Sequence, residues 1–223
     1  MSVWQVLAEE LKDLGFTVLA VALDTAGAAR SWIEAANPSY PCLIDADHHV
    51  AALYNLVNVP QAVWIDEAGR IVRPPESAGS DDAFRAMDRN TGAMPAEVLA
   101  QRQRRKTAYL DAVRHWARHG PASVNALDSR KAIERLAQPS EAEAEAHAWF
   151  LLGQHLQAHG QEAEAMAAFS KATSLHPASW AMWRQAAAKD ARGLAAGAAF
   201  WARVDALGER PYYPPADIVA PDG

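Results

Sequence analysis

The single cysteine, Cys42, has the side chain in this sequence that can take part in the widest range of covalent reactions. Cys42 follows Pro41 and opens a short apolar run, residues 42–44, which is typical of a buried strand. A peroxidatic or resolving thiol needs a lowered pKa and a basic neighbour, and no Lys, Arg or His stands next to Cys42. One cysteine also rules out an internal disulfide and a cysteine-based zinc site. We therefore interpret Cys42 as a structural thiol, with a redox role as the alternative.

Histidines occur in two pairs with a spacing of four residues, which places both rings of a pair on the same helix face. The pairs are His115 with His119 and His155 with His159. This spacing can hold a metal ion, but no glutamate follows the first histidine of either pair and no third ligand is evident. Asp45 and Asp47 lack the further ligands of a calcium loop. The sequence therefore predicts neither a metal site nor a cofactor.

A proline directly before an apolar run marks the next stretch with functional potential. Val59 and Pro60 precede residues 62–65, a turn signal follows at 67–69, and a second β-rich run begins at Arg70. This order predicts a strand, a hairpin turn and an antiparallel partner strand. Pro60 is predicted to have a cis peptide bond, because the cis form costs little only before proline.

The run Val-Pro-x4-Ile-Asp-x2-Gly-x-Ile, residues 59–71, resembles the cis-Pro hairpin of the thioredoxin-like superfamily. The resemblance extends over residues 3–90 and is closest to the redoxins and thiol–disulfide oxidoreductases of the TlpA/ResA type. In that family the cis-Pro loop borders the active-site dithiol and receives the substrate backbone. The resemblance therefore implies a substrate groove at Val59 and Pro60, with Trp4 nearby on the active-site helix. The family's catalytic Trp-x-x-Cys-x-x-Cys does not occur in this sequence.

The predicted elements of the first 92 residues follow the thioredoxin-like order with its beginning removed. They are helix 3–14, strand 16–23, helix 28–36, short strand 42–44, helix 48–56, the hairpin, a linker at 74–80 and helix 81–90. The resemblance implies an incomplete α/β sheet whose central strand and active-site turn are missing. That strand would lie between strand 16–23 and strand 62–66. Its absence leaves two apolar strand edges open to self-association.

We expect the natural gene product to extend upstream of Met1, because the chain opens inside the helix that should follow the central strand. The upstream segment would supply that strand and the active-site turn, with cysteine or selenocysteine at the reactive position. A misplaced start codon is one cause, and an in-frame UGA read as selenocysteine is another. The alternative is a short protein whose strands close up or pair with another chain.

The second half of the chain has a helical pattern with an internal repeat. A long helix is predicted at residues 96–118. Residues 146–179 match the spacing of the tetratricopeptide repeat (TPR), in which small residues let two helices approach and large residues fill the space between them. The matching positions are Trp149, Leu152, Gly153, Leu156, Ala165, Phe169, Ala172 and Pro177. Trp183 lies one repeat period after Trp149, which predicts a degenerate repeat there.

Length and composition fit a globular protein with one large or two small domains: 223 residues, 50% hydrophobic and 22% charged. We divide the chain into a thioredoxin-like domain, 1–92, and a helical region, 93–223. A net charge of −6 argues against nucleic acid as a partner. No run of about 18 apolar residues occurs, which argues against a membrane span. The start lacks the signals of a secretory leader, so a cytoplasmic location is predicted.

Two functions are compatible with this sequence. In the first, the protein is related to thiol–disulfide oxidoreductases but is inactive as a dithiol enzyme, because a Cys-x-x-Cys cycle needs two thiols. In the second, it is a non-catalytic scaffold or adaptor that binds a protein or peptide partner through the TPR region. The sequence leaves open whether the chain is an enzyme.

Overall fold

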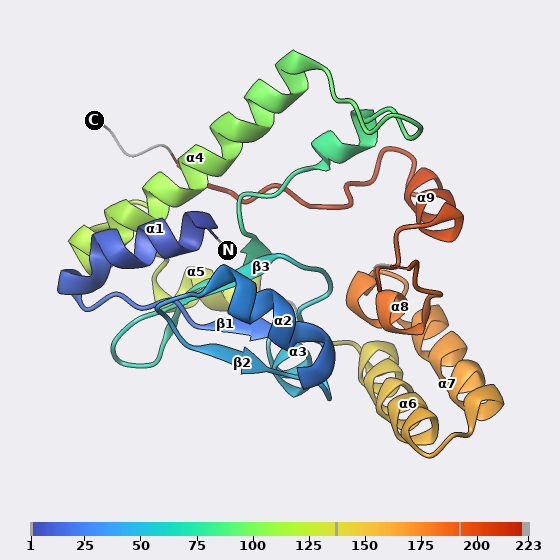
Figure 1. The fold of residues 1–223 in the computed structure, drawn as a ribbon. Coiled ribbons are helices and arrows are strands. Elements are labelled where there is room, and N and C mark those ends of the chain that lie inside the picture. The colour runs from blue at the N-terminus through green and yellow to red at the C-terminus, as the bar shows by residue number, and fades with distance from the viewer. Residues whose placement is uncertain (1, 137, 192, 220–223) are drawn as a thin grey trace. The chain divides into compact units, whose positions relative to one another are not determined.

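The computed structural model describes residues 2–136, 138–191 and 193–219 (Figure 1). Contacts group the chain into two compact units, each assembled from separate stretches of sequence. Unit 1 comprises Met1–Ile44, Pro60–Leu136 and Pro211–Gly223, and unit 2 comprises Asp45–Val59 and Ala137–Arg210. The division into domains 1–92 and 93–223 stays a prediction, and the contacts group the residues differently.

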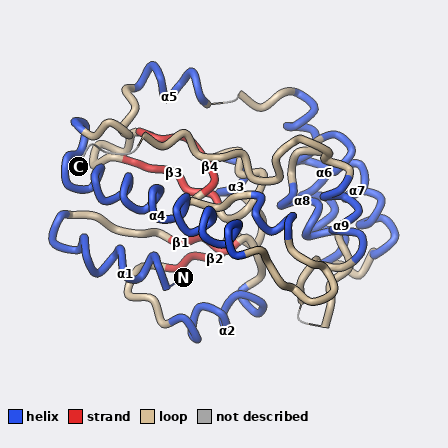
Figure 2. The backbone as a smooth tube through the Cα atoms, turned by 90° about the horizontal axis from the view of Figure 1, so that it is seen from above, coloured by secondary structure: helices blue, strands red, loops and turns tan. Residues whose placement is uncertain are grey.

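Unit 1 contains two separate two-stranded sheets (Figure 2). β1 (Ala20–Ala22) pairs in parallel with β2 (Cys42–Ile44). β3 (Gln61–Ile65) pairs antiparallel with β4 (Ile71–Ser77). β1 covers only part of the predicted strand 16–23, because its partner β2 is itself three residues long. Within the described residues, no strand joins β1 to β3.

Helices cover the sheets of unit 1 and supply most of its apolar core. They are α1 (Ser2–Leu11), α2 (Ala26–Ala36), α4 (Ala96–His119) and α5 (Ser129–Arg135), with 3-10 helices at Lys12–Leu14, Asp82–Ala86 and Gly120–Ala122. α1 lies alongside α4 (Figure 1), and the Glu10 carboxylate accepts hydrogen bonds from Arg114 and Arg118 at 2.7 Å each. The buried core consists of Leu7, Leu11, Trp64, Tyr109, Ala112 and Val113.

The predicted linker 74–80 is wrong, because β4 continues through it as far as Ser77. Pro74 and Pro75 form a bulge in this strand, since together they lie opposite the single residue Val63. A bulge leaves residues outside the hydrogen-bonded ladder, so the missing N–H groups of the two prolines cost little there. The two prolines therefore bend β4 without ending it, whereas the sequence alone indicates a break in the strand at this point.

The predicted helix 81–90 is wrong over most of its length. Only the 3-10 helix Asp82–Ala86 forms. The Asp88 carboxylate accepts the backbone N–H groups of Asn90 and Thr91 at 2.8 and 2.9 Å. Such local side-chain bonds offer the backbone an alternative to the helical ladder, so the chain turns here.

Unit 2 is helical and is centred on one hairpin. Its helices are α3 (His49–Leu53), α6 (Glu141–Ala158), α7 (Glu162–Leu175), α8 (Trp180–Ala186) and α9 (Ala198–Asp205). Ser140 begins α6 with a capping box, in which it exchanges side-chain and backbone hydrogen bonds with Glu143. α6 and α7 lie side by side and antiparallel (Figure 1). Their core consists of Ala146, Phe150, Ala165, Phe169, Ala172 and Met182.

Residues 45–59 join unit 2 although the rest of the N-terminal region lies in unit 1. The Ala46 carbonyl accepts a hydrogen bond from Gln154 Nε2 at 2.8 Å. The Val57 carbonyl accepts the Ala181 N–H at 3.0 Å. This segment therefore packs against α6 and α8 and covers part of the hairpin surface that a lone repeat would leave open.

Candidate functional site

The three residues expected to form a substrate groove are divided between the two units. Trp4 lies partly buried in α1, with its ring centroid 6.4 Å from that of Tyr109. Pro60 is exposed before β3, and its carbonyl accepts the Ala78 N–H at 3.3 Å. Val59 is 43% exposed and belongs to unit 2. Among the described residues of unit 1, no hydrogen bond or ring contact joins Trp4 to Pro60, and the cis bond at Pro60 stays a prediction.

Cys42 has the surroundings of a structural thiol. It lies half-buried in β2, and its Sγ–H donates a weak hydrogen bond to the Tyr40 carbonyl oxygen at 3.8 Å. Burial raises the pKa of the Tyr40 hydroxyl, so this part of unit 1 disfavours negative charge. In the described part of the chain, no Lys, Arg or His pairs with the sulfur. The contacts of Cys42 are thus those of a half-buried thiol in a strand.

A cavity of about 660 Å³ lies between the segment that leads into β1 and the end of β3. Phe16 lines it from the first segment, Ile65 from β3, and Trp116 from α4. The charged residues Asp66 and Arg70 in its lining pair with each other at 3.1 Å. Its described lining contains neither Cys nor His. We interpret the cavity as space between the β3–β4 hairpin, the segment before β1 and the helices α4 and α5, rather than as a catalytic site.

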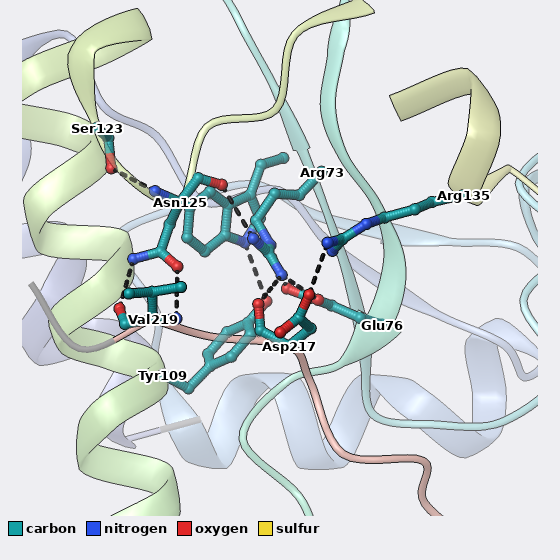
Figure 3. Close-up of polar contacts among 9 residues, drawn as sticks. Arg73, Glu76, Tyr109, Ser123, Asn125, Arg135, Asp217 and Val219 are labelled. Carbon is teal, nitrogen blue, oxygen red and sulfur yellow. Dashed lines mark hydrogen bonds and ion pairs between the residues drawn. The ribbon is translucent and has the colours of Figure 1, made fainter. Parts of the chain in front are cut away.

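Arg73 in β4 is a buried cation at the centre of a polar network (Figure 3). Its side chain is 2% exposed, and Nε and Nη2 donate to the two carboxylate oxygens of Glu76 at 2.7 and 2.8 Å. Nη1 donates to the Asn125 carbonyl at 3.0 Å, and Nη2 also donates to the Asp217 carbonyl at 2.8 Å. The guanidinium lies 5.3 Å from the ring centroid of Trp64. A buried charge is tolerated only with such complete pairing.

Asn125 extends this network to the C-terminal segment. Its side chain is buried, its Oδ1 accepts the Val219 N–H at 3.0 Å, and its Nδ2 donates to the Val219 carbonyl at 2.9 Å. Beside it, Arg135 Nη2 donates to the carboxylate of Asp217 at 2.6 Å. Figure 3 shows the side chains of Arg73, Asn125 and Arg135 converging on residues 217–219. Sequence reasoning missed this site, because no local pattern relates these residues.

Most residues expected to pack as a TPR lie in the interface between α6 and α7. They are Trp149, Gly153, Leu156, Ala165, Phe169 and Ala172. A Cβ at Gly153 would lie 2.7 Å from the Phe169 ring, so the two helices approach over a glycine. Leu152, expected in the same interface, is 41% exposed. Pro177 is exposed after α7, and its carbonyl accepts a hydrogen bond from Arg203.

The two histidine pairs singled out from the sequence each share a helix face. The ring centroids are 4.3 Å apart in the pair His115–His119 and 4.2 Å apart in the pair His155–His159. His115 Nδ1 lies 2.9 Å from the Ser123 hydroxyl. Across residues 2–136, 138–191 and 193–219, no group of three His, Cys, Asp or Glu side chains could hold a metal ion.

A third pair of histidines, in the hairpin of unit 2, was not singled out from the sequence. His176 is 3% exposed, and its Nδ1 lies 3.5 Å from Glu143 Oε1. Its ring centroid lies 6.2 Å from that of His147. Burial lowers the pKa of both histidines, and the charge of His176 lowers that of His147 further, while Glu143 opposes the shift. Both rings are therefore predominantly neutral at pH 7.

Unit 2 is expected to lose stability as the pH falls below about 6.5, the ordinary pKa of histidine. With lowered pKa values for His147 and His176, the folded state binds fewer protons than the unfolded state, so the stabilisation is complete above pH 6.5 and is lost below it. Urea denaturation at pH 7.5 and 5.5 measures the effect. His176→Gln should reduce the pH dependence, whereas the exposed control His155→Gln should not. Equal pH dependence in wild type and His176→Gln would contradict the prediction.

Comparison with known proteins supports part of the expected relationship. Residues 1–73 match the model of the AhpC/TSA family, which supports a relationship of this region to the thioredoxin-like redoxins. No curated protein and no solved structure gives a match. The chain thus combines a thioredoxin-like N-terminal region that has small sheets with a mostly helical remainder. No helix among the described residues has the length and hydrophobicity needed to cross a membrane.

Proposed function

We propose that this chain is a redoxin-related protein that runs no dithiol–disulfide cycle of its own and acts by binding a protein partner. The observation that carries the proposal is that Cys42, the one thiol of this chain, is half-buried and has no second thiol to react with. A dithiol cycle needs an attacking thiolate and a second thiol that resolves the mixed disulfide. This chain has one cysteine, half-buried in β2 and hydrogen-bonded to a backbone carbonyl.

We assign partner binding to the helical hairpin of unit 2, as a TPR with a degenerate repeat following at Trp183. The spacing of the sequence supports this assignment, as does the close approach of Gly153 to Phe169. The hairpin has large apolar side chains at its surface: Leu151 and Leu152 are 41% exposed and Met166 is 47% exposed. A protein or peptide partner would bury these side chains, each of which favours burial by about 25 cal/mol per Å² of apolar surface.

Insulin reduction with dithiothreitol tests the absence of dithiol turnover. We expect the chain to precipitate insulin no faster than dithiothreitol alone, because the chain has no second thiol of its own to resolve a mixed disulfide and its one thiol is half-buried. The matched control is Cys42→Ser, which should give the same rate as the wild type. Turnover well above the background that disappears in Cys42→Ser would contradict the proposal.

The open strand edges of unit 1 are a second candidate surface for partners. The Ala20 N–H bonds to the Pro41 carbonyl, so the backbone groups of Val21, the next residue of β1, point away from β2. Leu19 is also 57% exposed. We propose that self-association through such edges is the alternative mode of interaction, because unpaired edges template strand addition. The cytoplasmic location stays a prediction.

A further inference from the structure

The helices α8 and α9 of unit 2 pack through a cluster of aromatic side chains around Trp180. The Trp180 ring centroid lies 5.7 Å from that of Trp183 and 5.9 Å from that of Phe200. Trp180 and Phe200 are buried, whereas Trp183 is partly exposed. One tryptophan ring of the cluster therefore reaches the surface of unit 2.

Arg203 of α9 lies against both tryptophans of this cluster. Its guanidinium carbon is 4.9 Å from the ring centroid of Trp180 and 5.5 Å from that of Trp183. Nη2 donates a hydrogen bond to the Pro177 carbonyl at 2.7 Å, and no other N–H of the guanidinium, the buried Nε included, has a hydrogen-bond partner among the described residues. The rings thus hold the guanidinium by cation–π attraction while most of its donors are unused.

The positive charge of Arg203 is not neutralised by the described part of the chain. Burial lowers the pKa of its guanidinium, and no carboxylate among the described residues opposes that shift. A charge removed from water is normally paired with an opposite charge, as Arg73 of unit 1 is with Glu76. The Pro177 carbonyl and the aromatic faces supply only partial charges. Arg203 therefore has the electrostatics of a site that lacks its anion.

We propose that Arg203 and Trp183 form a binding site for an acidic side chain of a protein partner, with an apolar neighbour of that side chain lying on the exposed part of the Trp183 ring. The inference rests on the proposed function, which assigns partner binding to unit 2. The unused donors of a guanidinium can bind both oxygens of a carboxylate. The net charge of −6 argues against a nucleic acid phosphate as the anion.

The packing of Arg203 prepares it to bind a carboxylate. Its guanidinium is already half-buried, so a bound carboxylate displaces little further hydration from it. The two rings also fix the orientation of the guanidinium, so less side-chain entropy is lost on binding. An ion pair between fully exposed side chains changes affinity by about fivefold or less. At Arg203 we expect roughly tenfold, which is typical of hydrogen bonds to a charged group.

Titration of the full-length chain with two matched peptides tests the proposal. The peptides are acetyl-Leu-Glu-Leu-amide and acetyl-Leu-Gln-Leu-amide, which have nearly the same shape and differ in charge. Binding is followed by the NMR signals of the tryptophan indole N–H groups, and the variant Trp183→Phe identifies the signal of Trp183. The glutamate peptide should shift this signal with a dissociation constant roughly tenfold lower than that of the glutamine peptide. Equal dissociation constants for the two peptides would overturn the proposal.

Two variants assign the preference to one arginine. Arg203→Met keeps an apolar side chain against the tryptophan rings but has no charge, so it should bind both peptides equally weakly. The matched control Arg102→Met removes an exposed arginine of α4 and should keep the wild-type preference. Circular dichroism checks that both variants are folded, and the comparison of peptides on the wild type needs neither.

A preference for the glutamate peptide that persists in Arg203→Met would overturn the proposal, because another cation would then bind the acid. Sodium sulfate that shifts the Trp183 signal as far as the glutamate peptide does, at the same concentration, would also overturn it, because the site would then bind any anion. The two peptides differ in charge alone. These outcomes therefore decide the acidic site and do not bear on partner binding by the apolar side chains of α6 and α7.

Discussion

The Phe169→Ala variant is expected to lose about 3–5 kcal/mol of unfolding free energy, the cost of truncating a buried aromatic side chain. Phe169 is 1% exposed, and its ring centroid lies 5.6 Å from that of Phe150. The backbone of α6 approaches the same ring at Gly153, where a Cβ would lie 2.7 Å away. The variant therefore opens a cavity between two helices whose spacing the ring sets. Urea denaturation monitored by tryptophan fluorescence measures the loss.

The matched control for this prediction is Met166→Ala in the same helix. Met166 is 47% exposed, so its truncation should change the free energy of unfolding by about 0.5 kcal/mol or less. Hydrogen exchange of peptides from α6 and α7 gives a local measurement and should show faster exchange only in Phe169→Ala. Similar, small shifts of the denaturation midpoint in both variants would show that Phe169 is not a core residue.

The Arg73→Ala variant is expected to lose a similar amount, about 3–5 kcal/mol, because it leaves the other half of a buried ion pair without a partner. Glu76 loses two hydrogen bonds of 2.7 and 2.8 Å. The carbonyl groups of Asn125 and Asp217 lose their donor as well. Denaturation in urea measures the loss, and hydrogen exchange should show that it falls on unit 1, including residues 217–219.

Two variants distinguish the energetic effect of the buried Arg73–Glu76 pair from that of an ordinary surface charge. Arg70→Ala removes an arginine that is 68% exposed and paired with Asp66, so it should cost about 1 kcal/mol or less. The double variant Arg73→Met/Glu76→Met should be less destabilised than Arg73→Ala, because it removes both charges together. If Arg73→Ala lowered the free energy of unfolding no more than Arg70→Ala, the network around Arg73 would not be a stabilising feature of unit 1.

The parts of the fold that sequence reasoning predicts well are those set by local periodicity. The helix predicted at 96–118 is α4, Ala96–His119. The spacing of the residues from Trp149 to Ala172 predicts two helices that pack through small residues. This prediction is possible because a helical hairpin is formed by one short, continuous stretch of sequence. Leu152 departs from the pattern because a repeat spacing does not say which neighbours are present to cover each position.

The parts that could not be predicted depend on contacts between distant segments. Arg73 bonds to groups 52 and 144 residues away, and Asn125 bonds to Val219 across 94 residues. A single arginine in a strand is usually exposed, so its type alone gives no sign of burial. The packing of residues 45–59 in unit 2 likewise depends on tertiary contacts. The sequence alone groups these residues with their neighbours, since all of them lie within the stretch that matches a redoxin family model.

The interpretation of Cys42 as a structural thiol without a redox role is tested most directly by dimedone trapping after exposure to hydrogen peroxide. Dimedone labels sulfenic acid, the first product of a reactive thiolate. The Cys42 sulfur is half-buried and bonded to the Tyr40 carbonyl, without a paired cation in the described residues. Intact mass spectrometry should therefore find the unmodified chain after one equivalent of peroxide. A rapid, stoichiometric dimedone adduct that is absent from Cys42→Ser would contradict the account.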